Sequence, residues 1–377
     1  MTAKLRHAAG SLLVVGLAGT ELTNLERAWL KPVRPAGVIL FRRNIEDARQ
    51  TRTLLAEATA LCASNSFRCV DVEGGAVDRL RDALAPMPSA QAVARAARIP
   101  TLSQRTRENG APKLVHEHGE LVARGVKAFG FNTTLAPVLD LALPASAAVM
   151  ATRTAAPTAA GVVEYGRGFL AGLKKQGVVG CGKHFPGLGG GALDSHLETP
   201  SIRRTWRELW REDLAPWRAL RDELPMVMVS HAAYPDTRGK GSPACVSPYW
   251  ISTVLRKRIG YRGIVFSDDM EMGGILSFLP IEEAAIAAIR SGMDLLEICH
   301  SPELILRGYE ALVAEGERSA AFRKLLLARA LQTARKRARY FAGGLSKALS
   351  ARQFEVLRTR ILRFSETIVK TQEAQSA

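Results

Sequence analysis

Residues 177–187 read Gly-Val-Val-Gly-Cys-Gly-Lys-His-Phe-Pro-Gly. The first six are small or apolar and show no polar alternation, which is typical of a strand buried on both faces of a parallel sheet. Lys183 and His184 follow at once, where this strand is expected to end. Polar side chains directly after a buried strand are typical of the mouth of an α/β barrel, where catalytic groups project from the carboxyl ends of the strands.

Seven further runs of this kind occur along the chain, and amphipathic stretches separate them. Eight strands with helical crossovers predict a single (β/α)8 barrel, and 377 residues suffice for one with added loops. The other seven runs are Leu12–Val15, Gly37–Phe41, Phe67–Asp71, Asn132–Ala136, Met226–Ser230, Gly263–Phe266 and Asp294–Ile298. The predicted helices include Ile45–Cys62, Lys113–Phe129, Ala159–Gln176, Thr205–Asp222, Ile251–Ile259 and Ile281–Ser291.

The two ends of the chain need separate interpretation. No linker rich in Pro, Gly or Ser divides the sequence, so we expect one barrel domain over residues 1–345. A last helix and a polar tail are expected in residues 346–377, with Thr371–Ala377 frayed. The small apolar run Ala8–Gly19 resembles a signal peptide, but Leu12–Val15 also fits a first buried strand. We favour the strand, and with it a cytoplasmic protein.

The formal net charge is +16 and the isoelectric point about 10.0. Such a balance is compatible with nucleic acid, anionic lipid or an acidic substrate, or simply with solvated helix faces. The densest basic run, Arg323–Arg339, has Leu and Ala at helical spacing, which favours an outer helix with a basic outward face. No nucleic-acid recognition motif accompanies it, and no segment approaches the ~20 apolar residues of a membrane helix. We therefore expect neither nucleic acid nor membrane as a partner.

Features that suggest a metal or cofactor are incomplete. The five cysteines, an odd number without CxxC spacing, indicate buried thiols of a reducing compartment rather than disulfides or a zinc site. His116 and His118 lack the His-Glu-x-x-His spacing, and residues two apart on a helix do not share a face. The loop Gly187–Gly191 lacks the Gly-Lys-Ser/Thr ending of a phosphate loop. No metal and no cofactor is expected.

Four motifs fall at or near the ends of predicted strands. In order, they are Asp71–Gly75, Ala136–Asp140, Lys183–Gly187 together with Asp194–His196, and Phe266–Asp269. Each alone is a weak signal, but the four in this order resemble glycoside hydrolase family 3, specifically its β-N-acetylhexosaminidase (NagZ-like) branch. The resemblance spans residues 10–300.

The resemblance implies the catalytic residues. Asp268 matches the nucleophile, and a carboxylate there can form a covalent glycosyl-enzyme. His196 matches the acid/base of this branch, where most glycosidases use a second carboxylic acid. Asp194 matches the partner that orients the His196 ring. The structural alternatives are a helix N-cap for Asp268, a role that Asp269 can fill, and a solvated loop for residues 194–196.

Five further residues match the sugar-binding set of the family, and charged groups form strong hydrogen bonds to sugar hydroxyls in a dry pocket. The structural alternative for each is a surface charge or an ion pair at the barrel rim. Two positions depart from the family, and both concern the leaving-group side: Thr154-Ala155 replaces a usual aromatic, and Leu188 replaces a frequent histidine or polar residue. The five matching residues are Asp71, Arg79, Arg153, Lys183 and His184.

The resemblance implies a retaining β-N-acetylhexosaminidase that releases terminal β-linked N-acetylglucosamine, with muropeptide fragments of peptidoglycan recycling as its substrates. The partner is then a carbohydrate, and a monomer is compatible with the sequence. Three alternatives stay open: a family 3 β-glycosidase or phosphorylase of other specificity, an inactive sugar-binding protein, and a basic nucleic-acid-binding protein.

Overall fold

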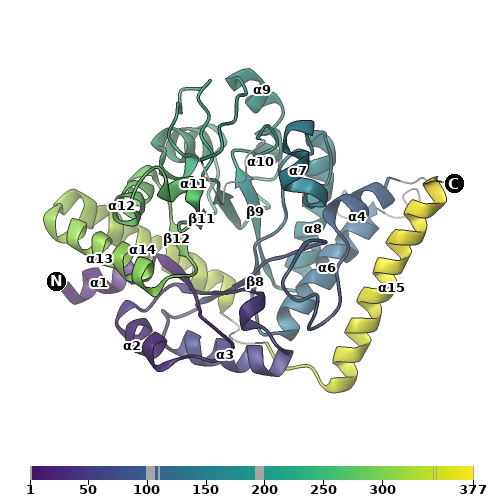
Figure 1. Cartoon of the computed structure of the whole chain (residues 1–377), viewed down its shortest axis with the longest axis horizontal. Helices are drawn as coiled ribbons and strands as arrows, with labels where there is room; N and C mark the ends of the chain where they lie inside the picture. The colour runs from purple at the N-terminus through teal and green to yellow at the C-terminus, as the bar shows by residue number, and fades with distance from the viewer. Residues whose placement is uncertain are drawn as a thin grey trace.

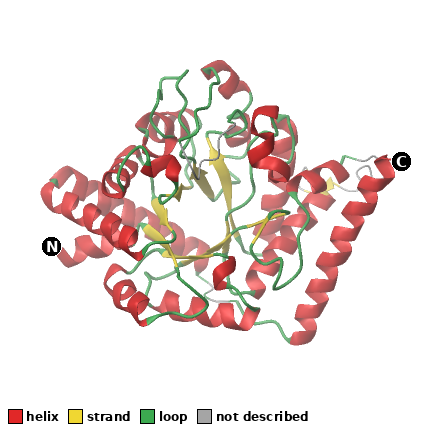
Figure 2. Ribbon diagram, in the orientation of Figure 1, coloured by secondary structure: helices red, strands yellow, loops and turns green. Residues whose placement is uncertain are grey.

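The computed structural model describes residues 2–98, 107–108, 111–191, 199–342, 344 and 346–376. Eight parallel strands close into a barrel with helices around it, which confirms the predicted (β/α)8 fold (Figures 1 and 2). The strands follow the chain around the barrel, and the last pairs with the first. They are β1 (Leu13–Gly16), β2 (Gly37–Leu40), β3 (Phe67–Val70), β8 (Thr133–Thr134), β9 (Val179–Phe185), β10 (Met226–Val229), β11 (Ile264–Asp269) and β12 (Leu295–Ile298).

Each strand overlaps one of the eight apolar runs, because the strands are buried on both faces. In β1, Val14 joins the core inside the barrel, whereas Leu13 and Val15 join the core between barrel and helices. This pairing within the barrel confirms that the N-terminal run is a strand. The predicted end of β9 at Gly182 was wrong, because Lys183 and His184 have buried partners that allow the strand to continue.

Helices surround the barrel, and short hairpins lie in its loops. The helices are α1 (Thr2–Gly10), α2 (Asn24–Val33), α3 (Ala48–Ala60), α4 (Ala90–Ala96), α6 (Lys113–Ala128), α7 (Ala147–Met150), α8 (Ala159–Lys175), α9 (Trp206–Arg211), α10 (Ala215–Ala219), a π-helix (Tyr249–Arg258), α11 (Gly273–Leu276), α12 (Ile281–Ser291), α13 (Pro302–Arg318), α14 (Ala320–Phe341) and α15 (Ala351–Ser376). The hairpins are β4 (Val72–Gly74) with β5 (Val77–Asp78), and β6 (Arg107–Glu108) with β7 (Ala111–Pro112).

The structure has two short helices where the sequence predicts one. The stretch Thr205–Asp222 divides into α9 and α10. Pro216 stands in the first turn of α10, where its missing N–H is tolerated, whereas in the middle of a continuous helix it would remove a hydrogen bond and clash with the preceding turn. Asp213 is buried at the break and pairs with Arg204 at 2.9 Å.

The C-terminal helices lie outside the barrel. The basic run Arg323–Arg339 belongs to α14, as predicted, but Arg337 is buried at 2% exposure rather than facing solvent. Helix α15 continues through Ser376, whereas the polar composition predicts a frayed end. It packs on α4 and α6 along one edge of the molecule (Figure 1).

The division into a barrel domain, residues 1–345, and a C-terminal helix remains a prediction. No helix in the described part of the chain is long and apolar enough to cross a membrane.

Candidate active site

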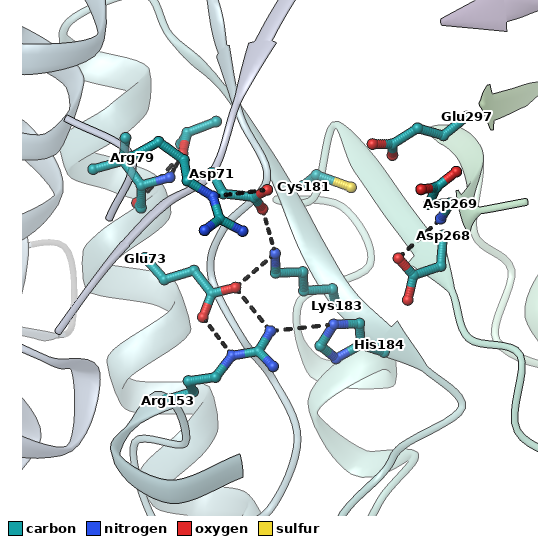
Figure 3. Close-up of polar contacts among 12 residues, drawn as sticks. Asp71, Glu73, Arg79, Arg153, Cys181, Lys183, His184, Asp268, Asp269 and Glu297 are labelled. Carbon is teal, nitrogen blue, oxygen red and sulfur yellow. Dashed lines mark hydrogen bonds and ion pairs between the residues drawn. The ribbon is translucent and has the colours of Figure 1, made fainter. Parts of the chain in front are cut away.

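Side chains from three of the predicted motifs meet at the carboxyl end of the barrel (Figure 3). Asp71 follows β3, Glu73 lies on β4, Lys183 is near the end of β9, and Asp268 is near the end of β11. Because parallel strands place their carboxyl ends at the same mouth, residues far apart in sequence become neighbours here.

Lys183 is the centre of a buried charge cluster. Its Nζ donates to Asp71 Oδ1 at 2.8 Å and lies 2.6 Å from Glu73 Oε1, and the residue is only 3% exposed. Glu73 also accepts two hydrogen bonds from Arg153, at 2.8 and 2.9 Å. Burial disfavours ionised Glu73, but the charges of Arg153 and Lys183 lower its pKa to about 2. Lys183 and Glu73 therefore both stay charged at neutral pH.

The coupling between Arg153 and Glu73 can be measured. The folded-state pKa of Glu73 lies below its ordinary 4.5, so its stabilising effect is complete above pH 4.5 and is lost as pH falls toward 2. We expect Arg153→Met to raise the pKa of Glu73 and to lower the free energy of unfolding at pH 7 by about 2 kcal/mol. This loss is smaller than for a fully buried ion pair, because Arg153 is partly exposed and solvent screens its charge. Urea unfolding between pH 3 and 7 measures both effects. A loss no larger than that of Arg167→Met, whose ion pair with Glu223 is half-exposed, would contradict the interpretation.

His184 is held by a second carboxylate. Its Nδ1 donates to Asp140 Oδ2 at 2.7 Å, and the same oxygen accepts the His184 backbone N–H at 3.1 Å. Asp140 Oδ1 accepts the backbone N–H of Leu188 at 2.7 Å. The other ring nitrogen, Nε2, lies 3.5 Å from the guanidinium of Arg153, on the side of the charge cluster. Asp140 therefore fixes both the tautomer and the direction of the ring.

Asp268 lies beside this cluster and is partly exposed. Its Oδ1 accepts the backbone N–H of Asp269 at 3.0 Å. Burial raises its pKa, but the charges of His184, His231 and Lys183 outweigh burial and hold the pKa below its usual range. The interpretation as a helix N-cap is wrong, since α11 begins only after Met272 and no side chain caps it. Asp268 is thus an ionised carboxylate open to the mouth of the barrel.

Two neighbours stabilise the end of β11. Asp269 Oδ1 accepts the backbone N–H of Glu271 at 3.1 Å, forming a local turn. His231 is buried, and its Nε2 donates to the Asp269 backbone carbonyl at 2.8 Å. Burial lowers the pKa of His231. We therefore assign His231 to positioning the strand end that carries Asp268.

The five predicted sugar-binding residues all lie in this region. Arg79 is the most loosely joined, with its Nε 4.0 Å from Asp71 Oδ2 and its guanidinium over the Phe41 ring at 5.9 Å. The predicted catalytic residues Asp194 and His196 lie outside the described residues. Within the described residues, no group of three or more His, Cys, Asp or Glu side chains is placed to hold a metal ion.

Known proteins with similar sequences and structures identify the family to which this site belongs. The model of the glycosyl hydrolase family 3 N terminal domain matches residues 4–328. The chain belongs to glycoside hydrolase family 3. It is therefore a glycosidase by family, and the motifs that meet at the barrel mouth are those that indicated the family in the sequence.

Curated relatives and solved structures of the family are similar over most of the chain. A protein of Alkalilimnicola ehrlichii named beta-hexosaminidase is 37% identical over 294 residues, covering 78% of this chain and 82% of the relative. A family 3 β-N-acetylglucosaminidase from Paenibacillus sp. has a TM-score of 0.83 at 28% identity, covering 96% of this chain and 68% of that one. NagZ from Neisseria gonorrhoeae, solved with N-trifluoroacetyl-D-glucosamine, has a TM-score of 0.75 at 27% identity. The match covers 94% of this chain and 98% of that one.

Sequence reasoning missed three carboxylates of this family 3 site. Glu73 and Asp140 stand inside the quoted motifs, and the buried cations Lys183 and Arg153 require counter-charges, which is a signal that could have indicated Glu73. Glu297 lies in a predicted strand. It shares the inward face of this strand with Leu295 and Cys299, both in the core inside the barrel.

Glu297 is a buried acid beside Asp268 and Asp269 (Figure 3). Its Oε1 accepts from Cys299 Sγ at 3.1 Å, and its Oε2 has no hydrogen-bond partner among the described residues. Burial raises the pKa of Glu297 well above its usual range, and the charges of Asp269, Asp71 and Asp268 raise it further. Burial and the neighbouring carboxylates therefore favour the neutral form of Glu297.

A neutral Glu297 predicts a distinct pH dependence of stability. Its folded-state pKa exceeds the ordinary 4.5, so its contribution is fully present below pH 4.5 and is lost as pH rises through the folded-state value. We expect Glu297→Gln, which cannot ionise, to unfold with a flatter pH dependence above pH 4.5 and to gain stability relative to the unmodified chain as pH rises. Urea unfolding at pH 4–8 measures this, with the exposed Glu303→Gln as control. If the free energy of unfolding changed with pH in the same way for the unmodified chain, Glu297→Gln and Glu303→Gln, Glu297 would be charged in the folded protein.

Proposed function

We propose that this chain is a retaining β-N-acetylhexosaminidase that removes terminal β-linked N-acetylglucosamine through a covalent glycosyl-enzyme. The observation that carries the proposal is the ionised Asp268 facing the Asp71–Lys183–Glu73–Arg153 cluster at the barrel mouth. The names of the relatives support the sugar, since they are hexosaminidases and glucosaminidases and one was solved with a glucosamine derivative.

The charge cluster suits a pyranose with several adjacent hydroxyls. Asp71 uses one oxygen for Lys183, while its other oxygen is 4.0 Å from Arg79 and has lone pairs to accept sugar hydroxyls. Lys183 and Arg153 can donate to hydroxyl oxygens, and Nε2 of His184, fixed by Asp140, points to the same region. Hydrogen bonds with a charged partner are about twice as strong as neutral ones, which favours precise seating of the sugar.

The reaction then has two steps. Asp268 attacks the anomeric carbon as the glycosidic C–O bond breaks, and the departing oxygen takes the proton of the His196 imidazolium. In the second step His196, now neutral, removes a proton from water, which displaces Asp268 and releases the sugar with its β configuration retained. Asp194 orients the His196 ring. The 2-acetamido group is bound but does not act as the nucleophile.

The positive net charge of the chain favours a substrate whose leaving group is anionic. Muropeptide fragments carry carboxylates, and a chain with a net charge of +16 attracts anionic substrates by long-range steering. A cytoplasmic location is part of the proposal, since all five cysteines are buried and unpaired, as in proteins of a reducing compartment.

The direct test is release of 4-nitrophenol from its β-N-acetylglucosaminide, measured beside the β-glucoside. Hydrolysis of the first substrate only, at equal rates in phosphate and phosphate-free buffer, is the expected result. Turnover that requires phosphate would indicate a phosphorylase. Absence of turnover on both substrates in a folded protein would indicate a binding role and would overturn the proposed activity.

A further inference from the structure

A pocket lies at the opposite end of the barrel from the active site. Its volume is about 350 Å³, and its lining includes His7 of α1, Arg34 at the end of α2, Ser64 and Asn65, and Arg337 of α14. These lining residues surround the points where β1, β2 and β3 begin, at residues 13, 37 and 67, whereas the active site lies where the strands end. The pocket is therefore separate from the catalytic mouth.

The charge of this pocket is uncompensated. Three of the described lining residues are basic, and none of them is acidic. Arg337 is 2% exposed, donates from Nη1 to the Ala36 carbonyl at 3.2 Å, and has no hydrogen-bond partner at Nε among the described residues. No ion pair of Arg337 or Arg34 occurs within the described part of the chain. Arg153 in the active site differs, since Glu73 neutralises it.

A buried guanidinium without a counter-charge is costly, because the desolvation of the ion is not offset by an attraction. Burial lowers the pKa of Arg337 to about 10. Burial also lowers the pKa of His7, and the charges of Arg34 and Arg337 lower it further. Each of these effects would be relieved by an anion in the pocket, and none of the described lining residues provides one.

We propose that this pocket binds an organic phosphate, with the phosphate on Arg337, Arg34 and His7 and the organic part in the remaining volume. A guanidinium presents its N–H groups as a fork that fits phosphate oxygens, and the two arginines match a dianion better than a single carboxylate. The volume falls in the range of small-molecule sites and equals that of about twelve water molecules, which is more than a bare phosphate fills. Ser64 and Asn65 at the opening offer side-chain donors for the ligand.

The proposal is tested on the full chain by calorimetric titration with glucose 6-phosphate, inorganic phosphate, succinate and glucose. We expect one site for the sugar phosphate, weaker binding of inorganic phosphate and succinate, and none of glucose. Arg34→Gln should weaken sugar-phosphate binding by about tenfold or more while leaving hydrolysis of the nitrophenyl substrate unchanged. Arg34 is exposed, so this variant does not threaten folding as Arg337→Gln does.

The matched control is Arg203→Gln, which removes the same charge from an arginine whose side chain is 76% exposed elsewhere on the surface. Equal affinities of the Arg34 and Arg203 variants would overturn the proposal, since binding would then follow net charge alone. If succinate bound more tightly than the sugar phosphate, the assignment of the ligand as a phosphate would be wrong. No heat up to about 10 mM ligand would overturn the site itself. None of these outcomes depends on the proposed glycosidase activity.

Discussion

Asp268→Ala is expected to lower kcat for the nitrophenyl N-acetylglucosaminide by on the order of 10⁴-fold or more, because it removes the atom that forms the glycosyl-enzyme. The variant should remain folded, since within the described part of the chain the Asp268 side chain makes a single hydrogen bond, which it accepts from the adjacent Asp269 N–H. Steady-state kinetics with circular dichroism measures both properties.

Added azide distinguishes a nucleophile from a residue that merely holds the site together. With Asp268 shortened, azide can enter the vacated space and attack the anomeric carbon in its place. We expect azide to restore part of the lost rate and to give the α-glycosyl azide, which product analysis detects. The exposed Asp222→Ala, with its side chain 81% accessible, is the control and should keep full activity without azide. A β-azide from Asp268→Ala, or near-normal hydrolysis, would contradict the nucleophile assignment.

Lys183→Met is expected to produce the largest loss of stability, about 3–5 kcal/mol at neutral pH. It removes the cation that lies 2.8 and 2.6 Å from the oxygens of Asp71 and Glu73. Glu73 keeps Arg153, but Asp71 retains only Arg79 at 4.0 Å, and removing one partner of a buried ion pair is strongly destabilising. The loss should be smaller near pH 4, because protonation of the freed carboxylates relieves the repulsion. Urea unfolding at pH 4 and 7 measures this.

The matched control for Lys183 is Lys174→Met, which changes an exposed lysine near the end of α8. Its effect should stay within about 0.5 kcal/mol, as for most surface substitutions. Similar free energies of unfolding for the two variants would mean that the charge cluster does not stabilise the fold.

The barrel could be predicted from the sequence because its strands are buried on both faces, so that each is a short apolar run with a polar residue close behind. Val14, Ile39 and Phe266 inside the barrel illustrate this pattern. The break between α9 and α10 was missed, although Pro216 was a visible signal against one continuous helix. The burial of Arg337 could not be predicted, because its position on α14 has the same basic composition as its solvated neighbours.

The sugar-binding candidates could be named because the family motifs stand at strand ends. Their partners were harder to see. Glu73 and Asp140 act through Lys183, Arg153 and His184, and such pairing depends on how strands close around the barrel rather than on spacing in the sequence. Glu297 was missed because a single glutamate in an apolar run can face either the barrel interior or the surrounding helices.

The measurement that tests the central claim most directly is covalent trapping of the nucleophile. The chain is incubated with a 5-fluoro N-acetylglucosaminyl fluoride, which keeps the acetamido group and slows release of the glycosyl-enzyme, and is then digested and examined by mass spectrometry. The proposed mechanism predicts one added glycosyl unit per chain, on Asp268. Label on another residue, or rapid turnover of the nitrophenyl substrate by a chain that never becomes labelled, would contradict it.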